Sequence, residues 1–298
     1  MQRIQLERLL TYAQCPLRYW WRYRAHIEAP VITEELPRLA LQQGLRHYYE
    51  GRAASLVDGC LAAWQAWADD WRCPPETPAL IARYVRMRAQ RHDEDLPVDE
   101  LREAWRDVTI PSASDYDLPA ALDDTVLAAL RYVGPECDGQ REVLLDWPFQ
   151  ISLTAGITVE GLASLVVLER DQVTVAEFHG YSPYCPSELF LSRHLSIVAL
   201  ANAEGTGWRG EWYVVYRHML TGFSASVFTT GDADRLLPVI SATLRGIECG
   251  VFLPRMAATD RECLRCPYRE LCTTPDGLDA LDDLDATLVA ASEEKKGS

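Results

Sequence analysis

Three cysteines stand close together near the end of the chain. The segment CLRCPYRELC places Cys263, Cys266 and Cys272 in a C-x2-C-x5-C pattern, and a fourth candidate, Cys15, lies almost the whole chain away in TYAQCPLRYWW. Thiolates bind soft metals and iron–sulfur clusters. A lone cysteine with a tight triplet fits a four-thiolate centre closed by tertiary contact, whereas two spaced pairs are typical of structural zinc. We therefore expect a [4Fe–4S] cluster here, with zinc as the alternative metal.

The other cysteines are scattered, and the sequence gives no reason to pair them. The N-terminal segment MQRIQLERLLTYAQC lacks the apolar region of a secretory signal, and no apolar run is long enough to span a membrane. We expect a cytoplasmic protein without a membrane partner, in which disulfides are rare. The following residues are expected to be core or surface thiols: Cys60, Cys73, Cys137, Cys185 and Cys249.

The composition is that of a globular protein with an acidic surface. The chain has 298 residues, 48% of them hydrophobic, and a formal net charge of −15. This charge argues against nonspecific DNA coating, because phosphate binding needs a positive surface, but it does not exclude a local basic groove. Acidic residues gather in the tail, 273–298, which we expect to be disordered and solvated.

Two kinds of periodicity divide the chain. Up to about residue 135 the apolar residues recur at helical spacing, as in the stripe Leu6, Leu9, Leu10 and Ala13, and Pro16 opens a second helix. Short runs rich in Val, Leu and Ile then predict strands over 142–153, 158–170, 172–181, 210–218 and 223–230, with helices over 187–203 and 233–250. This order predicts an α/β fold. We divide it into a helical region, 1–135, which carries the first cluster cysteine, and an α/β core with the cysteine triplet, 136–272.

Both cysteine-bearing segments also resemble a known family. TYAQCPLRYWWRY and GVFLPRMAATDRECLRCPYRELC look like the iron–sulfur staple of the CRISPR-associated exonucleases and of the AddB-type nucleases. Both groups belong to the RecB-like branch of the PD-(D/E)XK superfamily, and the resemblance covers roughly residues 5–272. It implies a restriction-endonuclease-like core sheet flanked by helices and a [4Fe–4S] staple on the four cysteines. It also implies DNA as a partner, single-stranded or a processed end, beside a helicase, nuclease or other effector subunit.

The same resemblance implies a set of active-site positions, several of which are altered here. The histidine of a G-x-x-H pattern is present in GLRHYYE, after Gly44. The aspartate place in GLAS holds a serine, the lysine place in AEFHG holds a histidine, and the glutamine place in SRHLSIVAL also holds a histidine. In this chain these positions are His47, Ser164, Glu177, His179 and His194.

The altered positions predict a protein that has lost catalysis. Phosphodiester hydrolysis needs carboxylates to hold Mg²⁺ and a cation near the attacking water, and Glu177 alone makes a poor Mg²⁺ or Mn²⁺ site. A nitrogen-rich Mn²⁺ or Zn²⁺ site on the histidines is a lesser alternative. A live nuclease would need carboxylates from elsewhere, such as Asp146, Glu160 or Glu169. A structural protein without nucleic-acid contact is a third possibility, which the acidic charge favours.

Arginines beside aromatic residues are the candidate nucleic-acid contacts. Arg18, Arg22 and Arg24 interleave with Tyr and Trp residues, a mixture that suits backbone contact and base stacking on single strands. Arg83 and Arg86 lie in an arginine-rich helix that could contact phosphate or an acidic partner. The alternative for both groups is structural, with the first helix packed around the metal centre and the second one solvated.

Overall fold

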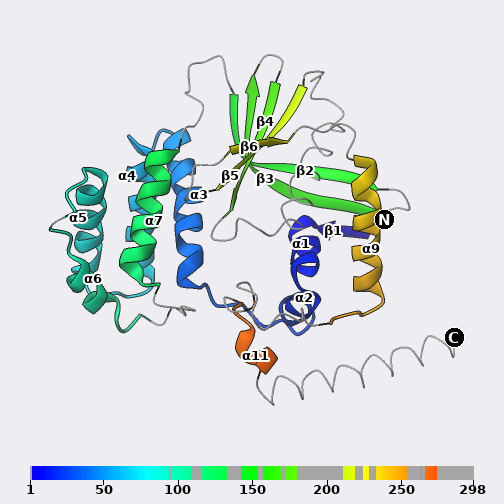
Figure 1. Ribbon diagram of the computed structural model, residues 1–298, viewed down its shortest axis with the longest axis horizontal. Coiled ribbons are helices and arrows are strands. Elements are labelled where there is room, and N and C mark those ends of the chain that lie inside the picture. The colour runs from blue at the N-terminus through cyan, green and yellow to red at the C-terminus, as the bar shows by residue number, and fades with distance from the viewer. Residues whose placement is uncertain are drawn as a thin grey trace.

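The chain folds as an α/β protein, as the sequence predicts, with helices packed against a mixed sheet in a computed structural model (Figure 1). The structure describes residues 2–93, 95–108, 110, 116–132, 142–153, 157–169, 172–179, 211–218, 224–227, 233–253, 263 and 266–273. Four features of the sequence analysis lie outside these residues: the predicted helix 187–203 with His194, Cys137, Cys185 and the tail beyond residue 273.

The N-terminus begins with a strand that the sequence did not predict. Strand β1 (Gln2–Gln5) pairs in parallel with the start of β3, with Gln2 opposite Ile157. Its sequence, QRIQ, carries one apolar residue, so tertiary pairing rather than local propensity makes it a strand. Helix α1 (Leu6–Gln14) follows, and its predicted stripe is confirmed, with Leu6 and Leu9 buried.

A single extended residue separates α1 from the next helix. Cys15 has φ −157° and ψ 114°, and Pro16 occupies the first position of α2 (Pro16–Tyr23). Proline suits this position because its missing N–H would have no partner in the first turn. The short 3-10 helix η1 (Thr33–Glu35) then leads to the helical bundle.

The helical bundle comprises α3 (Leu36–Tyr49), α4 (Leu56–Asp70), α5 (Thr77–Ala89), α6 (Val98–Trp105) and α7 (Leu118–Arg131). Trp64 lies at its centre with no exposed surface, and its Nε1 donates to Thr125 Oγ1 at 3.2 Å. Ser55 and Asp117 cap α4 and α7 by accepting backbone N–H groups, as their residue types favour.

Five strands after the bundle complete the sheet. They are β2 (Glu142–Leu153), β3 (Ile157–Glu169), β4 (Gln172–His179), β5 (Glu211–His218) and β6 (Ser224–Val227). The β2–β3, β3–β4 and β5–β6 pairs are antiparallel, whereas β4 and β5 are parallel. The strands predicted over these segments are therefore confirmed.

The sheet divides in the middle of β3. On one edge of β3, strand β1 pairs with residues 157–160 and strand β4 pairs with residues 165–169. Within the described strands, residues 161–164 have no neighbour on that edge. On the other edge, β2 pairs with β3 along its length. The exception is Asp146, which is opposite Ser164 but does not pair with it. Asp146 there has φ +47°, a conformation uncommon for a residue with a side chain.

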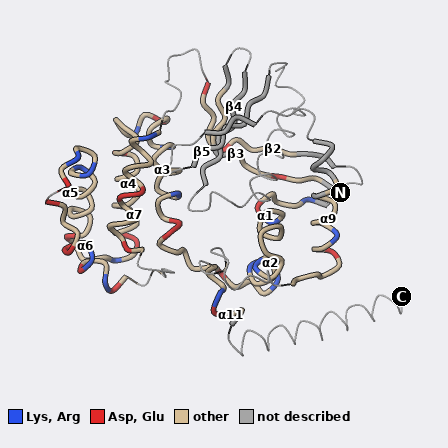
Figure 2. The backbone as a smooth tube through the Cα atoms, viewed as in Figure 1, with Lys and Arg blue, Asp and Glu red and all other residues tan. Residues whose placement is uncertain are grey.

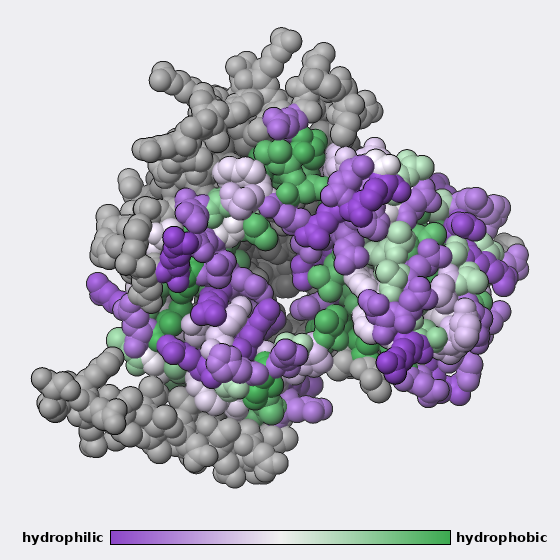
Figure 3. All heavy atoms as spheres, turned by 180° about the vertical axis from the view of Figure 1, so that it is seen from behind, coloured by the Kyte–Doolittle hydropathy of each residue, from purple (hydrophilic) through white to green (hydrophobic). Residues whose placement is uncertain are grey.

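The helices cover the two parts of the sheet separately. Helices α1 and α9 (Ala233–Glu248) pack against β3 through a core that includes Leu9, Val159 and Ile247. Helices α3, α4 and α7 pack against Leu165 and Val167 of the same strand. Seen from behind, the molecule is hollowed between the bundle and the α1–α2 side, with hydrophilic residues at the rim (Figure 3). No helix in the described part of the chain is long and apolar enough to cross a membrane.

Candidate metal centre

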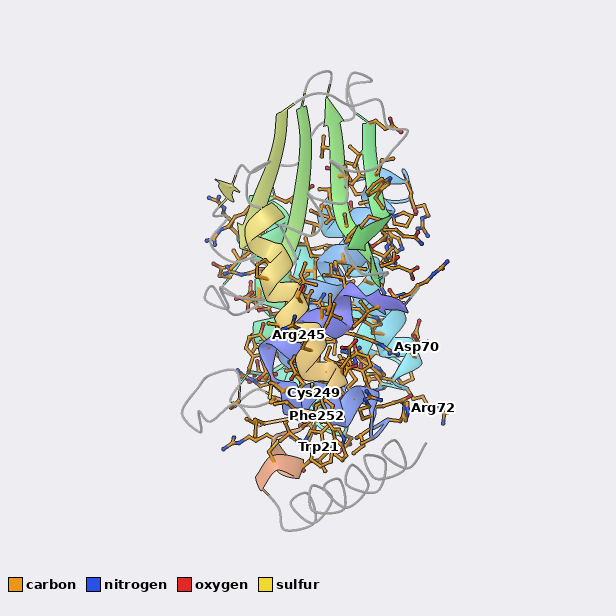
Figure 4. All side chains as sticks on the ribbon, turned by 90° about the vertical axis from the view of Figure 1, so that its right-hand side faces the viewer. Trp21, Asp70, Arg72, Arg245, Cys249 and Phe252 are labelled. Carbon is orange, nitrogen blue, oxygen red and sulfur yellow. The ribbon has the colours of Figure 1, made fainter. Side chains whose placement is uncertain are left out.

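The two ends of the described chain meet in a small core of their own. Leu17 and Trp21 from α2 and Tyr268 from the C-terminal segment are each 1% exposed. Cys15, Cys266 and Cys272 pack against these three residues from the sides. In the view of Figure 4, Trp21 lies below Phe252, and α11 (Arg269–Thr273) is seen below Trp21. We refer to this group as the cysteine core.

Backbone hydrogen bonds hold each cysteine in place. The Cys15 carbonyl accepts from Tyr19 N–H at 3.1 Å, so the cysteine caps α2. Cys266 N–H donates to Cys263 O at 3.2 Å, which closes a tight turn around the C-x2-C pair. Cys272 N–H donates to Tyr268 O at 3.2 Å as α11 begins.

A side-chain hydrogen bond ties the two ends together. Tyr268 Oη donates to Ile27 O at 2.9 Å, just beyond α2. Because Tyr268 is 1% exposed, losing this bond would leave its hydroxyl group without a partner. The C-terminal cysteines are therefore anchored to the segment that carries Cys15 by packing and by a specific polar contact.

The thiols of the cysteine core influence one another electrostatically. Burial raises the pKa of Cys272, and the neighbouring thiols of Cys266, Cys15 and Cys263 raise it further. Burial also raises the pKa of Cys266, while the Tyr268 backbone N–H and the Arg18 guanidinium lower it. Cys15, Cys263 and Cys266 thus all lie close enough to Cys272 to disfavour its thiolate. A bound cation would reverse this, since metal coordination stabilises thiolates.

The four thiols are neither linked as disulfides nor, within the described part of the chain, gathered as metal ligands. Cys15, Cys263, Cys266 and Cys272 form no disulfide. Over the residues that the structure describes, no group of three or more His, Cys, Asp or Glu side chains is placed to hold a metal ion. A metal or cluster would therefore need the four sulfurs to turn toward a common point within a core that they already share.

Two buried N–H groups show that the residues of this core fit an anionic sulfur centre. Neither Nε1 of Trp21 nor Nε of Arg18 has a hydrogen-bond partner among the described residues. Buried donors are nearly always paired, and an unpaired one costs about 1–3 kcal/mol. Thiolates and inorganic sulfide accept hydrogen bonds, whereas neutral thiols are weak acceptors. This role of Trp21 was not predicted from the sequence. Trp21 lies four residues after Leu17 on α2, so both side chains are on the same, buried face of the helix.

The remaining described cysteines lie away from this core. Cys60 is buried between α3 and α4, where burial raises its pKa to about 12. Cys73 is partly buried, and Cys249 is exposed at the end of α9, where Figure 4 labels it. All three are free thiols, in agreement with the sequence analysis.

The positions of the predicted nuclease site fall around the division of the sheet. Leu165 pairs with Ala176, so Ser164 and Glu177 are the next residues along β3 and β4. His179, two residues later, is opposite His218 of β5. His47 lies in the last turn of α3, which packs on the same part of the sheet. The backbone therefore brings Ser164 and Glu177 together.

Gly44 of the G-x-x-H pattern has a packing role. A Cβ atom there would lie 2.5 Å from Cys60 Sγ and 2.9 Å from the Cys60 backbone nitrogen. Gly59 of α4 approaches Gly44 equally closely. A Cβ atom added at Gly59 would lie 2.5 Å from the Gly44 carbonyl oxygen. The two glycines let α3 and α4 cross in close contact.

Two of the alternative carboxylates already have cationic partners. Arg46 holds Asp146 through both Nε and NH2, each 2.6 Å from Oδ2. Glu160 contacts Arg3 at 3.2 Å and accepts from Gln150 at 3.1 Å. Glu169 is the last residue of β3. A divalent cation at Asp146 Oδ2 would have to compete with the Arg46 guanidinium.

The predicted nucleic-acid contacts separate into two groups, because α2 and α5 lie on different sides of α3 (Figure 2). On α2, Arg22 NH2 contacts Glu7 at 2.8 Å, and Arg18 NH1 donates to Gln14 at 2.8 Å. Arg24, at the end of α2, is exposed. Arg83 and Arg86 are exposed on α5. Arg24 is thus the most accessible cation of the first group.

Comparisons with known proteins add little to this description. No protein-family model and no curated protein matches the chain. One solved structure, described as "Crystal structure of SSO0001", aligns with a TM-score of 0.32 and 15% identity, over 66% of this chain and 82% of that chain. An alignment at this TM-score does not establish a shared fold.

Proposed function

We propose that this chain is an iron–sulfur protein of the PD-(D/E)XK nuclease type that has lost catalysis. It would act as a DNA-binding or scaffolding subunit of a nucleic-acid-processing or defence complex, beside a helicase, nuclease or other effector. The observation that supports this most is the cysteine core, in which Cys15 from one end and Cys266 and Cys272 from the other pack around Trp21, whose buried N–H has no acceptor among the described residues. When bound, the cluster would supply a covalent cross-link whose binding energy stabilises the fold.

Metal and sulfide analysis of anaerobically purified protein tests the cofactor. We expect iron and acid-labile sulfide in equal amounts, broad visible absorption, and loss of both in Cys15→Ser. Cys249→Ser is the matched control, because Cys249 is exposed outside the cysteine core. Zinc in place of iron would change the cofactor to the alternative metal. Absence of any bound metal, with Cys15→Ser as stable as the parent, would contradict the proposal.

The arrangement around Asp146 supports loss of catalysis. Ser164 brings no charge to the place next to Glu177, and the nearest carboxylate on β2 is occupied by Arg46. Metal-dependent hydrolysis depends on oxygen ligands that can bind the ion together. We therefore expect no cleavage of single- or double-stranded DNA with Mg²⁺ or Mn²⁺.

An active nuclease is the second candidate, and one observation favours it. Asp146 faces Ser164 across the break in pairing and has φ +47°, and sparsely populated backbone conformations cluster at functional sites. In this reading Asp146 would replace the missing aspartate and Glu177 would be the second ligand. Metal-dependent cleavage that is abolished in both Asp146→Asn and Glu177→Ala would establish it. Asp99→Asn is the control, since Asp99 is almost fully exposed on α6.

A further inference from the structure

Trp21 is buried in a way that leaves its one polar atom unexplained by protein contacts. The residue is 1% exposed, and its Nε1–H finds no acceptor in the described part of the chain. Buried tryptophans normally donate this proton to an acceptor. Cys272 packs against the cluster that contains Trp21, and the indole N–H lowers the pKa of that thiol, although burial raises it more. The contact falls short of full hydrogen-bond geometry, as expected for a neutral thiol, which accepts weakly.

Arg18 carries a second buried donor on the same helix, α2. Its NH1 is fixed by Gln14 Oε1 at 2.8 Å, while its Nε is buried without a partner among the described residues. The guanidinium lowers the pKa of Cys266, which is otherwise raised by burial. Arg18 and Trp21 are three residues apart on α2, so both side chains leave the helix on neighbouring positions.

From this geometry we infer that Trp21 Nε1–H and Arg18 Nε–H donate hydrogen bonds to the sulfurs of Cys272 and Cys266 when these hold their metal centre. The inference rests on the proposed function for the identity of that centre. Trp21 and Arg18 are thus positioning residues. Their N–H groups withdraw electron density from the sulfurs, and such hydrogen bonds together with solvent exposure tune the reduction potential of a cluster.

The test replaces each donor with a side chain of similar shape that lacks the N–H group. Trp21→Phe keeps an aromatic ring, and Arg18→Met keeps the length of the stem. In cluster-loaded protein we expect both variants to shift the midpoint potential to more negative values, with iron content unchanged. Trp20→Phe is the matched control, because Trp20 packs at the same core without an assigned donor role, and its potential should equal that of the parent. An unchanged potential in Trp21→Phe would overturn the inference.

A second measurement keeps the inference testable if the chain holds no iron or if a variant fails to fold. Zinc added to the metal-free parent protein converts bound thiols to thiolates, which are stronger acceptors. The indole N–H resonance of Trp21 should then move downfield and its hydrogen exchange should slow, while that of Trp20 stays in place. If the Trp21 signal does not respond to bound zinc, the donor role of Trp21 is refuted. If the signal responds but the purified protein lacks iron, only the assignment of an iron–sulfur cluster is refuted.

Discussion

Arg46 on α3 and Asp146 on β2 form an ion pair in which two guanidinium nitrogens contact one carboxylate oxygen, each at 2.6 Å. The pair joins the helical bundle to the point where the sheet divides. It is also the feature that separates the two candidate functions, because the carboxylate cannot bind Arg46 and a divalent cation through the same oxygen at once.

This pair should contribute little to stability despite its geometry. The two side chains are 48% and 37% exposed, and exposed ion pairs typically contribute less than about 1 kcal/mol. We expect a double-mutant cycle of Arg46→Met and Asp146→Asn, measured by urea unfolding, to give a coupling of that size that weakens with salt. The Arg102–Asp117 pair, 54% and 33% exposed, is the matched comparison. A markedly larger coupling for Arg46 would mean that the sheet division depends on this contact.

The close crossing of α3 and α4 predicts a clear difference between two glycines. Gly44→Ala would force a Cβ atom against Cys60, and we expect a loss of about 1–3 kcal/mol in unfolding free energy from overpacking. Gly51→Ala has open space but φ +71°, so only backbone strain of about 1–2 kcal/mol applies. Adding Cys60→Ala should recover only part of the stability lost in Gly44→Ala, because the Cys60 backbone nitrogen stays 2.9 Å from the new Cβ atom, and it should leave Gly51→Ala unchanged. Equal responses in the two backgrounds would contradict the packing role of Gly44.

Removing one oxygen atom tests whether α11 docks as the structure shows. Tyr268→Phe deletes the hydrogen bond to Ile27 O but keeps the ring, so the unfolding free energy should fall by about 1 kcal/mol. Tyr48→Phe is the control, since Tyr48 is 37% exposed and should tolerate the change. If both variants unfold like the parent, Tyr268 is not anchored to Ile27 in solution.

Cys60 predicts a loss of stability in alkali. Burial raises its pKa from 9.0 to about 12, because the folded protein disfavours the thiolate. As the pH rises, the unfolded chain therefore loses this proton before the folded protein does. The stability that the buried thiol contributes is complete below the unfolded pKa and disappears as the pH rises from about 9 towards about 12. The unfolding free energy, measured between about pH 9 and pH 12, should fall less steeply with pH in Cys60→Ala than in the parent. Cys249→Ala, which removes an exposed thiol, should keep the parent slope.

The arginines of α2 predict a graded effect on DNA binding. Arg24 is exposed, whereas Arg22 is engaged with Glu7, so Arg24→Glu should weaken binding more than Arg22→Glu. If Arg24 contacts one phosphate, its loss should also reduce the slope of log affinity against log salt by about one. Arg83→Glu and Arg86→Glu test the second group in the same titration. Unchanged affinity in all of these variants would favour a structural protein without nucleic-acid contact.

Local patterns predicted most of the described secondary structure. Helical periodicity predicted the mostly helical region in which α1 to α7 lie, without separating α5 from α6, and apolar runs predicted β2 to β6. Gly250, with φ +70°, follows α9 as a terminating glycine should. Strand β1 could not be predicted in this way, because QRIQ becomes a strand only by pairing with Ile157–Glu160. The meeting of Cys15 with Cys266 and Cys272 was predicted from residue type and spacing, not from any local propensity.

The electrostatic details of the sites could not be read from spacing. Arg46 and Asp146 are a hundred residues apart, and nothing in either segment indicates that they pair. Arg18 is a candidate nucleic-acid contact in the sequence because arginine–aromatic mixtures are typical of one, with a helix packed around the metal centre as the alternative. The buried, unpartnered nitrogens of Arg18 and Trp21 become evident only when the cysteine core is assembled, since burial is a property of the fold.

The contact between Tyr268 and Ile27 spans 241 positions, which has a consequence for biosynthesis. Helix α2 leaves the ribosome early, and until α11 follows, Leu17 and Trp21 lack the partner that covers them in the finished protein. A chain interrupted before residue 263 would keep these apolar groups uncovered. Chaperones and proteases would therefore meet this surface on nascent chains that have not yet reached α11.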